Sequence, residues 1–384
     1  MKKLNIILLI FTPLFTFTQT TLIADPTFEQ RLINLGLDTG TPDGSVPTAN
    51  INTITSLDVS NDTIKDLSGI EDFTALEILN CSWNMIDTLD ISQNTALSYL
   101  SCESNGLDTL DVSQNINLEY LNCNYQINNA CIFFSSPDLN SGFFSLDLSQ
   151  NTNLKHLSCN SVGLNNLDLS QNSKLEYLDC GLNGLFTLNL NGADSLKYLY
   201  CDGSDVQFTF CPPLYNVSSL DVSNNKALIS LHCSYNYFTN GSLDLTQNTL
   251  LDTLECISNS LFTLKLNSPA SLSTINCSDN QISNLDLIGY TALTTLVCSQ
   301  NSLTNLDLTG ATALINLNFS ENGITSIDIS NAINLTDINS QHNWLTSIDV
   351  SNNTALIYLH CYSNQLSSID LSNNTALTYL NCGY

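Results

Sequence analysis

The sequence predicts a β-rich repeat solenoid, and two observations support this fold class. A 21-residue period runs through most of the 384-residue chain and is plainest as ALSYLSCESNGLDTLDVSQNI, from Ala96 to Ile116. Within each period the spacing LxxLxCxxNxL contains a segment that alternates as a short strand with one buried face does. A fixed period of this length indicates repeats that bury their apolar side chains against their neighbours. The short strands are therefore expected to stack in parallel.

The repeats are counted by the residue that ends the LxxLxC segment, which we call the ladder residue. Fourteen rungs are visible, with ladder residues Cys81, Cys102, Cys123, Cys159, Cys180, Cys201, Cys233, Cys256, Cys277, Cys298, Phe319, Ser340, Cys361 and Cys382. Strands stacked about 4.8 Å apart would make fourteen rungs span about 65 Å. The sequence thus predicts a long surface, not a pocket.

The second half of each repeat follows nearly the same pattern, LxxLDVSxNxxL, so that one repeat is nested in another. On these residues, from Leu57 to the C-terminus, the chain resembles bacterial leucine-rich repeat proteins of the nested 21-residue class. The resemblance implies a right-handed, curved solenoid with a parallel concave sheet. Extended or β segments are expected on the convex side, because LDLSxNTAL is short and broken by Ser and Asn.

The chain divides into three predicted regions. Residues 1–19 read as a signal peptide, residues 20–56 as an N-terminal helical cap, and residues 57–384 as the solenoid. Two insertions, 124–142 and 202–216, interrupt the period after a concave strand. The last repeat stops midway, so a C-terminal cap is expected to be missing. The N-terminal cap resembles that of internalin-like proteins, and the array resembles secreted surface proteins of the Bacteroidetes type.

The cap is expected to contain one short helix. Asp25 suits the N-cap, Pro follows it, and Gly36 stands after the last turn. Phe28, Leu32 and Leu35 repeat at helical spacing and would cover the open edge of the first rung.

Composition limits the location and the partners. Lys2 and Lys3 precede a short apolar run, as in a secretory signal peptide, and no later segment has the roughly 20 apolar residues that a membrane span needs. The protein is therefore expected to be secreted, and the resemblance implies attachment at the cell surface. The net charge of −27 disfavours nucleic acid and membrane-surface binding. An extracellular protein or glycan remains as partner, and the oligomeric state is open.

Twelve of the fourteen Cys residues occupy ladder positions, where Cys behaves as a small buried hydrophobe. No carboxylate or His shares that buried position, so a metal site is not expected. Cys131 and Cys211 lie off the ladder, one in each insertion, and their pairing in a disulfide is a hypothesis.

Asn follows most ladder residues by three positions and is expected to hydrogen-bond the backbone of the turn. These residues are Asn84, Asn105, Asn183, Asn236, Asn259, Asn280, Asn301, Asn322, Asn343 and Asn364.

The candidate ligand-binding surface is the concave face. Aromatic and imidazole side chains gather there at Tyr99, Tyr120, His156, Tyr177, Tyr198, Tyr200 and His232. Tyr gives large contact area with one hydroxyl, which suits a protein or the faces of sugar rings. The alternative is that stacked Tyr only stabilises adjacent strands. The insertions add Phe133, Phe134, Phe208 and Phe210, which either contact a ligand or pack on the solenoid flank.

A column of Asp residues follows the convex side, at Asp90, Asp111, Asp147, Asp168, Asp221, Asp244, Asp286, Asp307, Asp328, Asp349 and Asp370. Neighbouring carboxylates of this column repel one another. Hydrogen bonds from the Ser that follows each Asp are favoured over bound Ca²⁺ as the interaction that reduces this repulsion.

Catalytic motifs are missing, including GxSxG and HExxH, and no catalytic residue or cofactor is expected. The sequence predicts a non-catalytic recognition module. The alternative is a structural or adhesive spacer that forms part of a larger surface protein. One form of this alternative has bound cations that stabilise the spacer.

Overall fold

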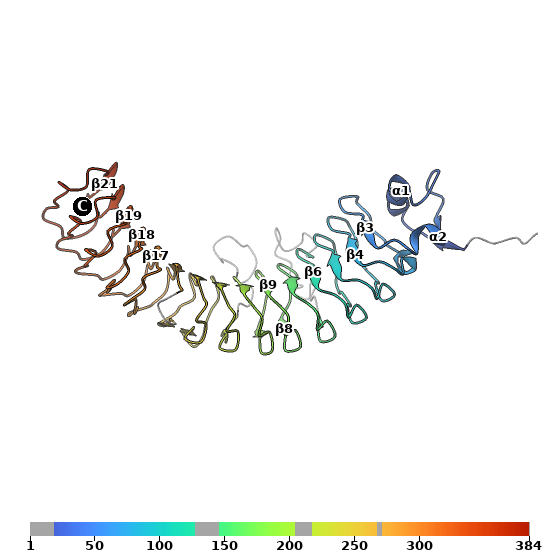
Figure 1. The fold of residues 1–384 in the computed structure, drawn as a ribbon, viewed down its shortest axis with the longest axis horizontal. Helices are drawn as coiled ribbons and strands as arrows, with labels where there is room; N and C mark the ends of the chain where they lie inside the picture. The colour runs from blue at the N-terminus through green and yellow to red at the C-terminus, as the bar shows by residue number, and fades with distance from the viewer. Residues whose placement is uncertain (1–18, 127–145, 204–216, 267–270, 384) are drawn as a thin grey trace, which may run out of the picture.

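The computed structural model describes residues 19–126, 146–203, 217–266 and 271–383, which form a curved solenoid (Figure 1). The concave side carries one parallel sheet, with strands that follow one another along the chain. Its strands are β3 (Ser56–Asp58), β4 (Ile78–Asn80), β5 (Tyr99–Ser101), β6 (Tyr120–Asn122), β7 (His156–Ser158), β9 (Tyr177–Asp179), β11 (Tyr198–Tyr200), β12 (Ser230–His232), β14 (Thr253–Glu255), β16 (Thr274–Asn276), β17 (Thr295–Val297), β18 (Asn316–Asn318), β19 (Asp337–Asn339), β20 (Tyr358–His360) and β21 (Tyr379–Asn381). The predicted fold class is confirmed.

This sheet has fifteen strands, one more than the predicted rungs. The additional strand is β3, after which Val59 takes the place of a ladder Cys. The Val59 N–H donates to the carbonyl of Asn80 at 2.9 Å, as the Cys81 N–H donates to the carbonyl of Ser101 at 2.8 Å. Val is as apolar as Cys, so it fills the same buried place although the repeat around it is irregular.

The core lies behind the concave sheet, and two of its buried columns belong to the concave strands and the residues that follow them. In β5 the middle residue, Leu100, and the ladder residue that follows, Cys102, are both fully buried. The described ladder Cys residues are free thiols, and all except Cys382 are buried. This agrees with their predicted role as small hydrophobes. Each fully buried Leu contributes roughly 1.5–3 kcal/mol, so stability accumulates rung by rung.

The predicted Asn ladder joins consecutive rungs at the turns after most of the concave strands. The Asn105 Nδ2 donates to the carbonyls of Cys102 and of Cys81 in the preceding rung, both at 3.0 Å, and its Oδ1 accepts from the Ile86 N–H at 3.0 Å. Gln126 makes the equivalent bonds in the rung of Cys123, which the Asn pattern alone did not predict. The ladder thus satisfies backbone groups that the turn buries.

A second Asn ladder, not singled out from the sequence, runs through the other half of the repeats. The Asn115 Nδ2 donates to the carbonyls of Ile91 at 3.1 Å and Asn94 at 2.9 Å, both in the preceding rung. The same pattern holds at Asn94, Asn151, Asn172, Asn225, Asn248, Asn353 and Asn374. The signal for this ladder was the final Asn of LDVSQN.

The convex side consists of turns and short strands, as predicted. The strands β8 (Asn166–Asp168) and β10 (Thr187–Asn189) pair in parallel, as do β13 (Ser242–Asp244) and β15 (Thr263–Lys265). The Asp column forms local turns: Asp111 Oδ1 accepts from the Ser113 N–H at 2.9 Å. The hydrogen bonds from Ser113 hold the pKa of Asp111 below its ordinary value. These bonds support the hydrogen-bonded interpretation of the column.

The N-terminal residues form a compact cap on the first rungs. β1 (Thr20–Leu22) pairs antiparallel with β2 (Ser45–Pro47), and α1 (Pro26–Asn34) lies between these two strands in the chain. The short helix α2 (Thr48–Ile51) follows β2, and the 3₁₀ helix η1 (Ile70–Asp72) follows β3. Asp25 Oδ1 accepts from the Thr27 N–H at 2.7 Å, which makes it the N-cap of α1. Phe28 and Leu32 are fully buried. The predicted helix and the burial of Phe28 and Leu32 are confirmed, but the prediction for Leu35 is wrong, because this residue lies at the C-cap and is 44% exposed.

Several predictions concern residues outside the described part of the chain. These are the signal peptide up to residue 18, and Cys131, Phe133, Phe134, Phe208, Phe210 and Cys211 of the insertions. Among the helices that the structure does describe, none has both the length and the apolar character of a membrane span.

Candidate functional site

Aromatic side chains form a continuous stack along the concave sheet. Tyr99 of β5 and Tyr120 of β6 stack with 4.3 Å between ring centroids and 6° between ring planes. The His156 ring of β7 follows at 4.4 Å from Tyr120, and Tyr177 of β9 follows at 4.2 Å from His156. These separations match the spacing of neighbouring strands, so the register of the sheet places the rings face to face.

The stack changes column at β11. Tyr200, the last residue of this strand, lies 5.5 Å from Tyr177 and 4.6 Å from His232 of β12, measured between ring centroids. Tyr198 begins the same strand and is 39% exposed. The structure therefore brings six of the seven predicted concave residues into one stack, with Tyr198 beside it.

The stacking determines which parts of the rings face solvent. Tyr120 and His156 each lie between two stacked rings, so both of their faces are covered. Tyr177 is stacked on His156 on one side and is tilted by 39° from Tyr200 on the other. These rings are half-buried, and they offer ring edges and Tyr hydroxyls. The interior of this stack therefore does not present a flat platform for the faces of sugar rings, which was one of the two uses expected from the sequence.

Burial disfavours the charged forms of two residues of the stack. Burial raises the pKa of Tyr120 to about 12 and lowers the pKa of His156, the latter against the opposing effect of Asp179. The His156 Nε2 lies 3.1 Å from the Ser158 Oγ. In the next part of the stack, the His232 Nδ1 lies 3.2 Å from Glu255 Oε2.

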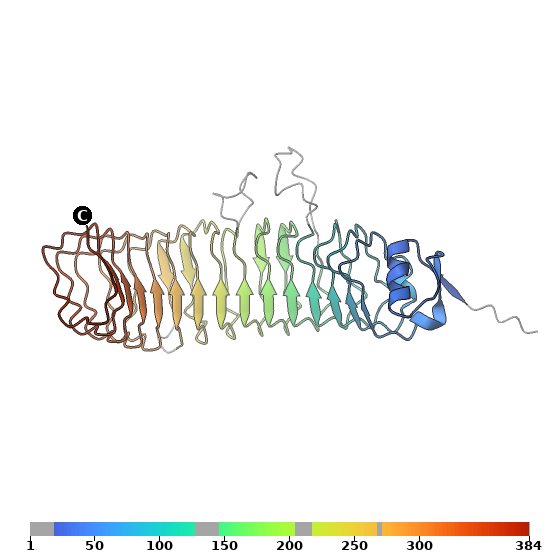
Figure 2. The ribbon, with the colours of Figure 1, turned by 90° about the horizontal axis from the view of Figure 1, so that it is seen from above.

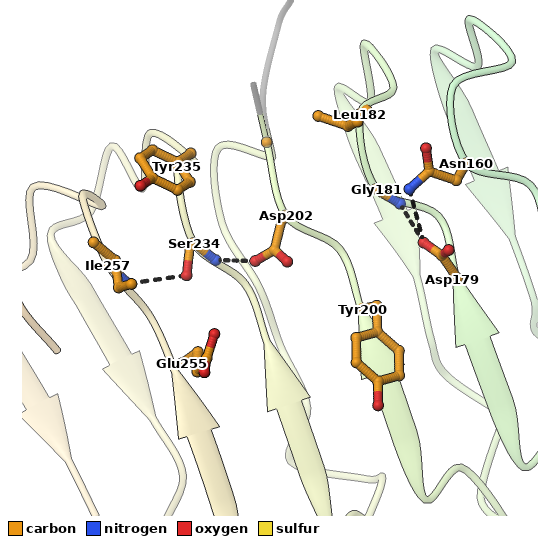
Figure 3. Close-up of a pocket in the computed structure, with 11 residues that line it drawn as sticks. Asn160, Asp179, Gly181, Leu182, Tyr200, Asp202, Ser234, Tyr235, Glu255 and Ile257 are labelled. Carbon is orange, nitrogen blue, oxygen red and sulfur yellow. Dashed lines mark hydrogen bonds between the residues drawn. The ribbon is translucent and has the colours of Figure 1, made fainter. Parts of the chain in front are cut away.

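Carboxylates lie where the concave strands end. Asp179 Oδ1 accepts from the Asn160 Nδ2 at 3.1 Å, and Asp202 Oδ1 accepts from the Ser234 N–H at 2.6 Å. With Tyr200 and others they line a shallow pocket of about 380 Å³ (Figure 3). Burial raises the pKa of Asp202 although the hydrogen bond from Ser234 opposes this.

The pocket lining contains three carboxylates, those of Asp179, Asp202 and Glu255, and no Lys or Arg among the described residues. These acids do not converge as ligands, since no group of three or more His, Cys, Asp or Glu in the described part of the chain is arranged to hold a metal ion. The pocket is thus an anionic depression beside the aromatic stack.

The turns after the concave strands form a second surface, which we call the strand-end edge; the arrowheads in Figure 2 point to it. The residue two places after the ladder residue adopts a left-handed backbone, with φ of 58° at Trp83 and 55° at Tyr125. This conformation costs an L-residue roughly 1–2 kcal/mol and suits Gly, Asn or Asp best. Trp83, Tyr125 and Leu182 nevertheless occupy it while 57%, 50% and 41% exposed.

The chain was compared with known proteins. No family model matches it. A stretch of 42 residues, 11% of the chain, is 55% identical to internalin J of Listeria monocytogenes and covers 5% of that protein. The solved functional domain of internalin J, whose description includes a cysteine ladder, matches with a TM-score of 0.60 and 31% identity over 95% of this chain. The chain spans 66% of that domain, slightly less than two thirds.

Two other bacterial structures share the fold. A leucine-rich repeat protein of Leptospira interrogans matches with a TM-score of 0.61 and 22% identity over 87% of this chain and 91% of its own. The effector YopM of Yersinia pestis matches with a TM-score of 0.63 and 23% identity over 86% and 83%. The chain has the leucine-rich repeat solenoid fold that these bacterial proteins share. Among particular proteins, it is similar to the internalins, internalin J included.

Proposed function

We propose that the chain is a non-catalytic recognition module that binds an extracellular protein through its concave face. The observation that carries the proposal is the aromatic stack from Tyr99 to His232, which places Tyr hydroxyls and ring edges in one row on an open sheet. Rigid aromatic side chains with a polar tip bind protein surfaces at low entropic cost. The internalin-like relatives support the same class of function.

A protein fits this surface better than a glycan does. Sugar rings bind aromatic side chains through an open ring face, and both faces of Tyr120 and of His156 are covered by neighbours. The hydroxyl row can instead exchange hydrogen bonds with a polypeptide. The negative net charge further favours a neutral or cationic surface.

The proposed location is outside the cell, attached to a bacterial surface. The support is the signal-peptide pattern of residues 1–19, together with the resemblance of the nested 21-residue repeats to Bacteroidetes-type surface proteins. A catalytic role has no support in the motifs of the chain.

The test compares the chain from Thr20 onward with a stack variant on arrays of extracellular proteins and glycans. The variant carries Tyr99→Thr, Tyr120→Thr and Tyr177→Thr, because Thr occupies the same position naturally at Thr253, Thr274 and Thr295. The control carries Tyr358→Thr and Tyr379→Thr, in the same column at the other end. We expect a protein ligand whose affinity falls at least tenfold in the stack variant only. Equal binding by all three proteins would contradict the proposal.

The second candidate is a structural or adhesive spacer. It is favoured by the uninterrupted register of fifteen strands and by the stabilising effect that stacked rings have on adjacent strands. A stack variant that melts much earlier than the control, with no ligand found on either array, would favour this spacer.

A further inference from the structure

The later strands of the concave sheet form an uncharged surface. Each of these strands has a buried middle residue, and its first and third residues face the concave side. From β16 to β18 the first and third residues are Thr274, Asn276, Thr295, Val297, Asn316 and Asn318. The flanking strands β14 and β19 bring the first charges, those of Glu255 and Asp337. On a chain with a net charge of −27, such a stretch without charge is a distinct surface.

The register places the hydroxyl groups of three strands in a row. Thr253 of β14 is the partner of Thr274 of β16, which is in turn the partner of Thr295 of β17. These strands lie side by side along the solenoid (Figure 2). Their spacing of about 4.8 Å is close to the length of one sugar unit in an extended glycan. A Thr hydroxyl both donates and accepts hydrogen bonds, as a sugar hydroxyl does, so the row can contact successive sugar units.

The amides beside this row have their oxygens engaged by the protein. Asn276 Oδ1 accepts from the Ser278 Oγ at 2.6 Å, and Asn318 Oδ1 accepts from the Ser320 N–H at 3.1 Å. These bonds orient the amides and leave each Nδ2 as a donor on the concave face. Donors that are already oriented reduce the entropic cost of binding a ligand.

An aromatic ring with a different environment from the stack follows this surface. Tyr358 begins β20 and is 45% exposed. Its ring centroid lies 6.5 Å from that of Tyr379, and the ring planes are tilted by 43°, so the two rings are not face to face. The partner of Tyr358 on the other side is Asp337, which has no ring. Tyr358 therefore offers the kind of ring face that stacking covers at Tyr120 and His156.

We propose that the concave strands β14 to β20 bind a neutral glycan that lies along the solenoid, with sugar units over successive rungs and one sugar ring against Tyr358. A glycan is favoured over a protein because β16 to β18 contain no aromatic or Arg residue, the usual anchors of a protein interface. A neutral glycan is favoured over an acidic one because no Lys or Arg follows Lys265 in the sequence. This site is separate from the aromatic stack and goes beyond the protein recognition proposed above.

The test measures the binding of oligosaccharides by isothermal titration calorimetry. The neutral probes are cellohexaose, laminarihexaose, mannohexaose, xylohexaose and maltohexaose, together with the disaccharide of each series. Hexasaccharides of hyaluronan and alginate are the acidic probes. We expect a neutral hexasaccharide to bind at least tenfold more tightly than its disaccharide, because it contacts more rungs.

Two variants locate the site. Thr274→Val with Thr295→Val removes two hydroxyls of the row and keeps the shape of the side chains. Asn276→Ser with Asn318→Ser removes two amide donors, and Ser stands at the same strand position naturally at Ser101. Each variant should weaken the binding of the hexasaccharide at least tenfold.

The matched control makes the second of these changes outside the site. Asn80→Ser with Asn122→Ser alters the same strand position in β4 and β6 and should bind the hexasaccharide like the unmodified chain. The variant Tyr358→Thr, Tyr379→Thr separates the two proposals. It should lose the glycan and keep the protein ligand, whereas the stack variant should lose the protein ligand and keep the glycan.

Three results would overturn the inference. The first is that no neutral hexasaccharide binds at millimolar concentration. The second is that an acidic hexasaccharide binds more tightly than every neutral one. The third is that the Thr and Asn variants both bind within twofold of the unmodified chain. None of these results bears on the aromatic stack, so the proposed protein recognition stands or falls by its own test.

Discussion

His156 and Tyr177 lie face to face on neighbouring strands, with 4.2 Å between ring centroids and 5° between ring planes. Burial in this stack lowers the pKa of His156 below its ordinary value. In the unfolded chain a His has a pKa of about 6.5, so the unfolded state binds the proton more readily. The stability linked to this group is therefore complete above about pH 6.5, and it is lost as the pH falls through the lower folded pKa.

The first prediction follows from this linkage. His156→Tyr should reduce the loss of melting temperature between about pH 7.5 and pH 5, because Tyr stacks in the same place without titrating in this range. Thermal unfolding at both pH values measures the difference. Equal pH sensitivity of the variant and the unmodified chain would contradict the assignment to His156.

Asp25 connects the capping helix to the first rung. Its Oδ1 caps α1, and its Oδ2 accepts from the Lys65 N–H at 2.7 Å and the Asp66 N–H at 3.2 Å. We expect Asp25→Ala to destabilise the protein by about 2 kcal/mol, because it removes a helix cap together with a buried link. Urea denaturation measures the loss. Asp87→Ala, at an exposed position, serves as the control and should stay within about 0.5 kcal/mol.

The second Asn ladder should contribute measurably to stability. Asn115→Ala leaves two buried carbonyls of the preceding rung without the side-chain donor and should cost roughly 1–3 kcal/mol. Asn117, two residues later, is exposed and donates to the Thr95 carbonyl at 3.1 Å. Asn117→Ala should therefore change little. Similar unfolding free energies for both variants would show that the ladder is not stabilising.

The ladder thiols should be inert in the native protein. Burial raises the pKa of Cys123 and Cys277 to about 12, so almost no thiolate is present at pH 8. Alkylation of the native chain followed by peptide mapping should label Cys382 and leave the buried ladder thiols unlabelled until the chain is denatured. The same map tests the hypothetical disulfide, since free Cys131 and Cys211 would take the label. Rapid native labelling of Cys123 would contradict its burial.

The sequence was sufficient for the repeat, the parallel concave sheet and the first Asn ladder, because each repeats with the 21-residue period. It placed Leu57 of β3 in the solenoid but did not count this strand as a rung, because Val59 replaces the ladder Cys. It missed Gln126 because this longer amide breaks the Asn pattern while keeping the chemistry. The second Asn ladder was visible in LDVSQN, but a sequence pattern does not distinguish a buried Asn from one in a solvated turn.

The sequence predicted which residues of the candidate site share a position in the repeat, but it did not predict how their rings are arranged. Tyr99, Tyr120, His156 and Tyr177 share one position in consecutive rungs, so their proximity followed from the register. That their faces cover one another, and that Tyr200 continues the stack in place of Tyr198, depends on side-chain rotamers.

The sheet register also persists where the chain between two strands is much longer than one repeat. Leu121 of β6 lies opposite Leu157 of β7, and Leu199 of β11 lies opposite Leu231 of β12, as if no residues had been added between them. The added residues do not alter the pairing of the strands on either side of them. Such segments can therefore change in length and sequence over evolution at little cost in folding, so that new specificities can arise on an inherited frame.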